Sequence, residues 1–152
     1  LSDFITFLEG NPIGPLIVVL NCDGGDASVG HMLLYIMNGE KERITLIGMC
    51  SLYSSAFELF LRFEGTKKLT FGTRGMYHYS SEKVLMSTAG GPGSVEAASI
   101  LVTDKSHKAR ELNIASNVMT PDELRRFKKG EDVFFGFERM LEIFDKSNIE
   151  II

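Results

Sequence analysis

The chain has 152 residues, 44% of them hydrophobic, and a formal net charge of −4. These values predict one compact domain, spanning residues 1–152, with enough apolar material for a hydrophobic core. The negative charge argues against a nucleic-acid-binding domain, because such domains are usually basic. No apolar run reaches the ~18 residues that a membrane-spanning helix needs, and no signal peptide is visible, so a cytoplasmic protein is expected.

Metal ligands and disulfide partners are scarce in this sequence. Its two cysteines, Cys22 and Cys50, lie in or beside predicted core strands and are expected to be buried free thiols. The three histidines, His31, His78 and His107, are widely separated, so a metal site is not expected. His31 and His107 fall in helical patterns and are expected to be surface or packing residues.

The first half of the chain alternates helical and strand patterns. Residues 1–10 read as an amphipathic helix, and the continuous apolar run 16–20 predicts a parallel strand buried on both faces. A second helix follows Gly25 and closes at residues 38–39, and residues 44–49 form the next buried strand. This alternation predicts an α/β fold with a parallel sheet.

The second half begins with an apolar helix at residues 54–63, which is hydrophobic nearly all round and therefore expected at the centre of the core. The aromatic and aliphatic side chains of Phe57, Leu59, Phe60 and Phe63 are expected to pack there. The remaining segments are two short strands (68–71 and 74–79), a Gly/Pro/Ser-rich loop (86–94), a long helix (95–114 or beyond) and a helix with Thr120 as its N-cap.

Four features that acyl-transfer chemistry requires occur in order along the chain. Ser54 stands between a buried strand and an apolar helix, His78 ends a short strand, and Asp132 precedes an amphipathic run. A serine needs a base to take its proton, an acid to orient that base, and N–H groups for the oxyanion. Gly25, in the pair that ends the first strand, and Ser55 are the candidate N–H donors. The alternative for Ser54 is a helix N-cap, and for His78 a half-buried strand histidine.

The segments Leu-Asn-Cys-Asp-Gly-Gly at 20–25, the serine at 54 and Met-Tyr-His at 76–78 resemble the proteolytic subunit of the caseinolytic (Clp) protease. The resemblance covers nearly the whole chain and marks it as a divergent member. It implies the ClpP/crotonase-like α/β fold, with repeated β-β-α units, parallel buried strands and a protruding handle helix. The family's N-terminal segment is expected to be absent from this chain.

The third triad member has more than one candidate. Asp132 precedes Val-Phe-Phe and a turn into a helix, which looks like the family's acidic motif. Glu131 is the second candidate for the acid of the triad. Asp122, in Thr-Pro-Asp-Glu, reads better as an acid in the first turn of a helix, where the helix dipole favours it.

The resemblance implies a serine-type endopeptidase that works in a ring-shaped homo-oligomer, without a cofactor, and is fed by an ATP-driven unfoldase. Unfolded protein or peptide would be the substrate, and neither nucleic acid nor membrane is expected as a partner. Two alternatives stay open: a catalytically inactive ring subunit, and an acyl-CoA enzyme of the crotonase fold. Subunit contacts are expected along the helix at 95–114, through residues such as Leu112 and Ile114.

Overall fold

The computed structural model describes residues 2–79, 95–144 and 149–152, and for residues 95–105 it describes the backbone alone. The Gly/Pro/Ser-rich loop predicted at 86–94 lies outside the described residues. The chain divides into two compact units. Unit 1 comprises Leu1–Tyr77 and Phe134–Ile152, and unit 2 comprises His78–Val133.

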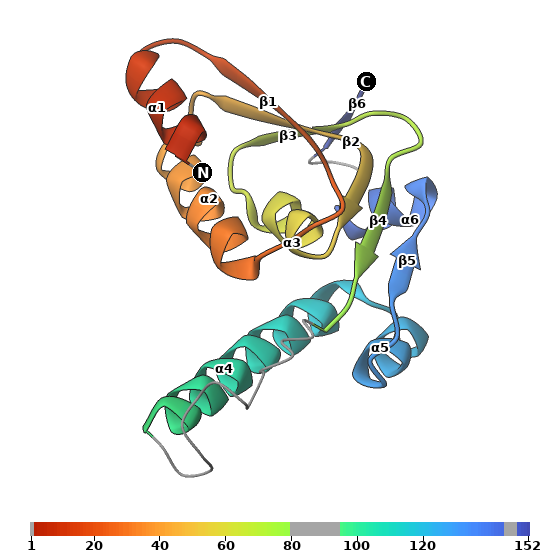
Figure 1. Cartoon of the computed structure of the whole chain (residues 1–152). Coiled ribbons are helices and arrows are strands. Elements are labelled where there is room, and N and C mark those ends of the chain that lie inside the picture. The colour runs from red at the N-terminus through yellow and green to blue at the C-terminus, as the bar shows by residue number, and fades with distance from the viewer. Residues whose placement is uncertain (1, 80–94, 145–148) are drawn as a thin grey trace. The chain divides into compact units, whose positions relative to one another are not determined.

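The helices and strands follow the alternation expected from the sequence (Figure 1). Those of unit 1 are α1 (Ser2–Gly10), β1 (Leu16–Cys22), α2 (Ala27–Gly39), β2 (Ile44–Tyr53), α3 (Ser55–Arg62), β3 (Thr66–Leu69), β4 (Arg74–Tyr77), α6 (Phe137–Ile143) and β6 (Glu150–Ile151). Unit 2 contains α4 (Val95–Val118) and α5 (Pro121–Lys128), and β5 (Val133–Phe135) carries the chain back into unit 1.

The strands form one sheet in the order β5-β4-β2-β3-β6, and β1 pairs with β2. The β1–β2, β2–β3, β2–β4 and β3–β6 pairs are all parallel, which confirms the predicted α/β class. β2 pairs with β3 through residues 45–48 and with β4 through residues 51–53. The carboxyl end of β2, where Ser54 follows, therefore lies beside β4.

Helix α3 is the centre of the unit 1 core, packed against β1, β2 and β4 with α2 beside it (Figure 1). Phe57 and Phe60 are 0% exposed, and Leu59 and Phe63 are buried with them, so the predicted core stripe is confirmed. Phe57 stacks on Phe135 with ring centroids 5.2 Å apart, which ties the helix to β5. This packing gives the first turn of α3 a rigid support.

Thr120 caps α5 as the sequence predicts. Its hydroxyl accepts a hydrogen bond from the Glu123 N–H, and the Glu123 carboxylate accepts one from the Thr120 N–H, a reciprocal capping box. Pro121 occupies the first turn, where its missing N–H costs nothing.

Two expectations about burial are wrong. β1 is not buried on both faces, because Ile17 is 71% and Val19 53% exposed, and within the described residues no element covers that face. Cys50 is exposed rather than buried. Its backbone has a φ of 56°, at a register irregularity between β1 and β2 that turns its side chain out of the core.

Candidate active site

Ser54 has a strained backbone at the junction of β2 and α3. Its φ is 55° and its ψ is −122°, and such positive φ values are rare for residues other than glycine. A conformation of this kind costs about 1–3 kcal/mol and persists only where the surroundings hold it. Here the Ser54 N–H donates a hydrogen bond to the Met76 carbonyl of β4, at 2.8 Å. A sharp strand-to-helix turn bearing a serine is how nucleophile elbows present their hydroxyl.

The side chain of Ser54 does not cap the helix that it precedes. Ser54 occupies the N-cap position of α3 without a side-chain capping hydrogen bond. By contrast, Asp26 and Thr120 cap α2 and α5 through their side chains. The Ser54 hydroxyl therefore does not cap α3, although Ser54 stands at the N-cap position, and its role as the nucleophile stays a prediction.

The glycine pair lies directly against this turn. Gly24 and Gly25 have φ values of 97° and 146°, which residues other than glycine rarely adopt. A Cβ atom on Gly24 would lie 2.7 Å from Ser54 Cβ and 2.8 Å from the Tyr53 carbonyl. The Ser55 hydroxyl donates a hydrogen bond to the Gly25 carbonyl at 3.3 Å. The fold thus brings Ser54, Ser55 and the glycine pair together within unit 1.

A pocket of about 240 Å³ opens beside the glycine pair and the first turn of α3. Most of its wall is apolar, and its lining residues include Gly24, Gly25, Ser55, Val29 and Leu33. At its edge, hydrogen bonds from the Ser28 hydroxyl and backbone N–H hold the pKa of Asp26 below its usual value. The pocket is thus an apolar recess with one carboxylate at its edge.

His78 and Asp132 lie together in unit 2. His78 Nδ1 is 3.0 Å from Asp132 Oδ1, and the two side chains are 30% and 53% exposed. The ring of the adjacent Tyr79 packs on Phe127 of α5, with centroids 4.3 Å apart. An Nδ1–H that donates to a carboxylate fixes the tautomer in which Nε2 can accept a proton.

The two other candidates for the third member have different partners. Glu131 forms an ion pair with Arg126, with Oε2 3.0 Å from Nε. Asp122 lies in the first turn of α5 and pairs with Arg125. Asp132 is therefore the carboxylate that this structure places on His78, and its catalytic role stays a prediction.

The sequence analysis missed a buried charged cluster on α3. Glu58, expected only as part of an apolar helix, is 5% exposed and contacts His31, Arg62 and Tyr77. His31, expected to be a surface or packing residue, is part-buried, and its Nε2 lies 3.1 Å from Glu58 Oε1. The single acidic residue in the apolar run 54–63 is the signal that could have revealed this cluster.

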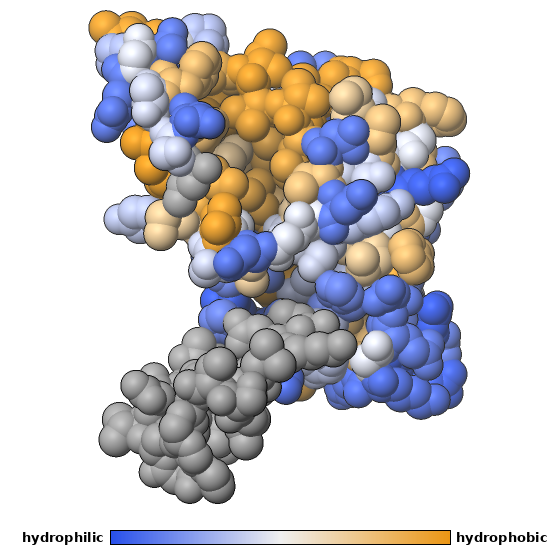
Figure 2. All heavy atoms as spheres, in the orientation of Figure 1, coloured by the Kyte–Doolittle hydropathy of each residue, from blue (hydrophilic) through white to orange (hydrophobic). Residues whose placement is uncertain are grey.

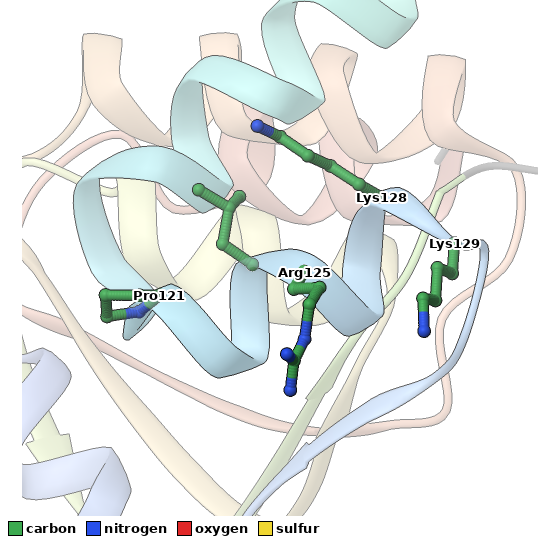
Figure 3. A pocket seen from close by; sticks show the side chains of 5 residues that line it. Pro121, Arg125, Lys128 and Lys129 are labelled. Carbon is green, nitrogen blue, oxygen red and sulfur yellow. The ribbon is translucent and has the colours of Figure 1, made fainter.

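A second hollow, of about 470 Å³, lies along α5 in unit 2. Arg125, Lys128 and Lys129 line it together with Pro121 and Leu124 (Figure 3). Figure 3 shows the charged ends of Arg125 and Lys128 pointing in opposite directions, so they do not converge on one anion. None of its lining residues is a Ser, Thr, Cys, His, Asp or Glu.

Within the described ranges, no three His, Cys, Asp or Glu side chains gather in an arrangement that could hold a metal ion. In the same part of the chain, none of the helices combines the length and apolar character needed to span a bilayer. Both statements concern only the residues that the structure describes.

Comparison with solved structures identifies the fold. The chain superimposes on a peptidase from Plasmodium falciparum with a TM-score of 0.66 and 11% identity, covering 99% of this chain and 85% of that one. It superimposes on a mutant of ClpP1 from Listeria monocytogenes with a TM-score of 0.64 and 16% identity, covering 99% and 81%. The chain therefore has a divergent ClpP-like fold, as its motifs predicted.

Comparisons based on sequence add no further relatives. No family model matches the chain. No curated protein matches it either.

Proposed function

We propose that this protein is a serine peptidase that hydrolyses peptide bonds with Ser54, His78 and Asp132 as its catalytic residues. The observation that carries the proposal is the backbone of Ser54, which is strained at a strand-to-helix turn while its side chain leaves the helix uncapped. Strain of this kind is typical of active sites, where it presents a reacting group. The ClpP-like fold supports the same conclusion.

The reaction begins when Ser54 Oγ attacks the peptide carbonyl and His78 Nε2 takes the hydroxyl proton. Asp132 accepts the Nδ1–H of His78 and stabilises the imidazolium that forms. The backbone N–H groups of Gly25 and Ser55 bind the oxyanion, assisted by the positive end of the α3 dipole. The amine product then leaves with the proton from His78.

The acyl group stays on Ser54 until water removes it. His78 takes a proton from that water, the new carboxylic acid forms, and Ser54 recovers its hydroxyl hydrogen. No cofactor enters either half of the reaction. The apolar pocket beside Gly24 and Gly25 is a suitable place for a side chain of the substrate.

Fluorophosphonate labelling followed by intact-mass analysis tests this proposal. We expect one adduct per chain, mapped to Ser54 by peptide sequencing, because an activated serine attacks phosphorus as it attacks a carbonyl. An inactive ring subunit or a crotonase-type acyl-CoA enzyme would leave Ser54 unlabelled. Labelling at another serine would contradict the assignment of the nucleophile.

We also propose that units 1 and 2 act as one domain, since the catalytic residues are divided between them. The assembled form would be a homo-oligomeric ring that takes peptides or unfolded protein from an ATP-driven unfoldase. A cytoplasmic location fits the two free cysteines, Cys22 and Cys50, which a reducing compartment would keep as thiols.

The surface of unit 1 supports self-association. Hydrophobic side chains gather over β1, as Figure 2 shows. The exposed hydrophobic residues of β1 are Ile17 and Val19, and Phe7, Ile13 and Met32 are exposed in α1, in the segment before β1 and in α2. We call these five residues the apolar face of unit 1. Contiguous exposed apolar surface is typical of a subunit interface, and a second copy of this chain would bury it.

Ile114 is a weaker candidate for a subunit contact than the sequence suggested. Ile114 is only 8% exposed, so its side chain is already buried in unit 2. The present proposal therefore adds the apolar face of unit 1 to the subunit contacts expected along the helix at 95–114.

We expect Ile17→Glu to shift the assembly toward smaller species, because the substitution places a charge on the exposed side of β1, within the apolar face. Light scattering coupled to size-exclusion chromatography measures the molar mass. Thr66→Glu adds the same charge at an exposed position of β3 outside this face, and should leave the mass unchanged. A wild-type chain that is monomeric and fully active would contradict the ring.

A further inference from the structure

Glu58 is a buried carboxylate in the middle of helix α3. It is 5% exposed, and its chain neighbours Phe57 and Leu59 are buried as well. Removing a charged group from water is costly unless it is paired and hydrogen-bonded. Arg62 Nη1 lies 2.8 Å from Glu58 Oε1 and His31 Nε2 lies 3.1 Å from the same oxygen. The other oxygen, Oε2, accepts a hydrogen bond from the Tyr77 hydroxyl at 3.2 Å.

Tyr77 is the last residue of β4 and of the first segment of unit 1, and the next residue is His78. Its side chain is 2% exposed, with the ring tilted against Phe57 at a centroid distance of 5.5 Å. A hydroxyl buried this deeply needs a partner, because losing one costs the desolvation penalty of the group. Glu58 supplies that partner, and so holds the end of β4 against α3.

Helix α3 thus holds the last two residues of β4 at two points. The Ser54 N–H donates to the Met76 carbonyl, and one helical turn later Glu58 accepts from the Tyr77 hydroxyl. The same turn is closed by the Glu58 N–H, which donates to the Ser54 carbonyl at 3.1 Å. The residue that bears the hydroxyl nucleophile and the residue that precedes His78 are therefore linked through one turn of α3.

We propose that Glu58 is a positioning residue for the peptidase reaction. Through its hydrogen bond with the Tyr77 hydroxyl, it holds in place the end of β4, from which the backbone continues into His78. This inference rests on the proposed function. Its physical basis is that a general base loses much of its effect when its backbone support shifts, since a displacement of about 1 Å can cost 100-fold in rate. Arg62 and His31 hold Oε1 of the carboxylate, which orients Oε2 for this contact.

Tyr77→Phe is the decisive variant, because it removes the hydroxyl and keeps the ring that packs on Phe57. We expect kcat to fall by about 10- to 100-fold with KM within about twofold, because substrate binding is unchanged while His78 is held less firmly. The kcat is calculated per mole of Ser54 that reacts with fluorophosphonate, so that unfolded protein in the sample does not lower its value. Glu58→Met should lower kcat to a similar extent. The double variant Glu58→Met/Tyr77→Phe should have nearly the same kcat as either single variant, because both changes remove the same hydrogen bond.

Glu64→Gln is the matched control. It removes the charge of another glutamate of unit 1, one that pairs with Lys41 at the surface, and should leave kcat and KM unchanged. A role limited to stability would lower the melting temperature in Tyr77→Phe without changing kcat per titrated site. An unchanged kcat in Tyr77→Phe overturns the inference.

Hydrogen exchange tests the inference even if the proposed function fails. If wild-type Ser54 does not react with fluorophosphonate, the peptidase proposal is lost, but the link between α3 and β4 remains measurable by mass spectrometry. We expect faster exchange in peptides that contain Ser54 and His78 in Tyr77→Phe, and no change in Glu64→Gln. Identical exchange in wild type and Tyr77→Phe overturns the link.

Discussion

Ser54→Ala is expected to abolish peptidase activity, with kcat lower by about a millionfold, while the fold and assembly are retained. Losing the nucleophile of a serine triad has an effect of that size in enzymes that use one. The fold should survive because the Ser54 side chain makes no capping hydrogen bond, and the hydrogen bond from its N–H to the Met76 carbonyl does not depend on the side chain. Turnover of short fluorogenic peptides, together with circular dichroism, checks both parts.

Ser51→Ala is the control for this substitution. Ser51 lies in β2, where its N–H donates to the Asn21 side chain, and its hydroxyl has no part in the proposed reaction. We expect turnover within about twofold of wild type, since a surface hydroxyl contributes little. Loss of turnover in Ser51→Ala with full turnover in Ser54→Ala would mean that the nucleophile has been misassigned.

Asp132→Asn is expected to lower kcat by about 10⁴-fold, with little change in KM or melting temperature. An amide of the same shape can present its NH₂ group to Nδ1, which favours the tautomer with the proton on Nε2 and removes the charge that stabilises the imidazolium. The small change in stability is expected because Asp132 is 53% exposed, where an ion pair with a histidine contributes little. Steady-state kinetics on the same peptides measures the effect.

Glu131→Gln and Asp122→Asn are the matched controls, since each removes one carboxylate from the neighbourhood of α5. Glu131 pairs with Arg126 and Asp122 pairs with Arg125, and neither carboxylate is part of the pair between Asp132 and His78. Both variants should keep turnover within about threefold of wild type. If turnover fell further in Glu131→Gln than in Asp132→Asn, Glu131 and not Asp132 would be the third member of the triad.

The elements of this fold could be predicted because the rules that form them act over a few residues. Apolar periodicity predicted α2 and β2, and the Thr-Pro-Asp-Glu segment predicted the capping box of α5. The alternation of strands and helices then implied a parallel sheet, which the pairing of β2 with β1, β3 and β4 confirms. The placement of a serine at a strand-to-helix junction was visible for the same reason.

Burial was predicted less well, because it depends on what covers a residue in the folded chain. An apolar run such as Leu16–Cys22 reads as a fully buried strand, yet in the described part of a single chain Ile17 and Val19 remain exposed. Cys50 turned outward because β2 is irregular there, and the partner strand determines that irregularity. A subunit interface and a hydrophobic core have the same composition, so the sequence could not separate them.

The sequence by itself determined which residues were candidates for the site: Ser54 at its junction, the glycine pair at 24–25, His78 at the end of its strand, and the acidic residues Asp122, Glu131 and Asp132. Only the tertiary structure decided three further points. Ser54 adopts its strained φ because β4 holds its N–H, Asp132 meets His78 across 54 residues of chain, and Glu58 is buried against Tyr77. These are contacts between segments distant in sequence, and their geometry depends on packing that no local pattern records.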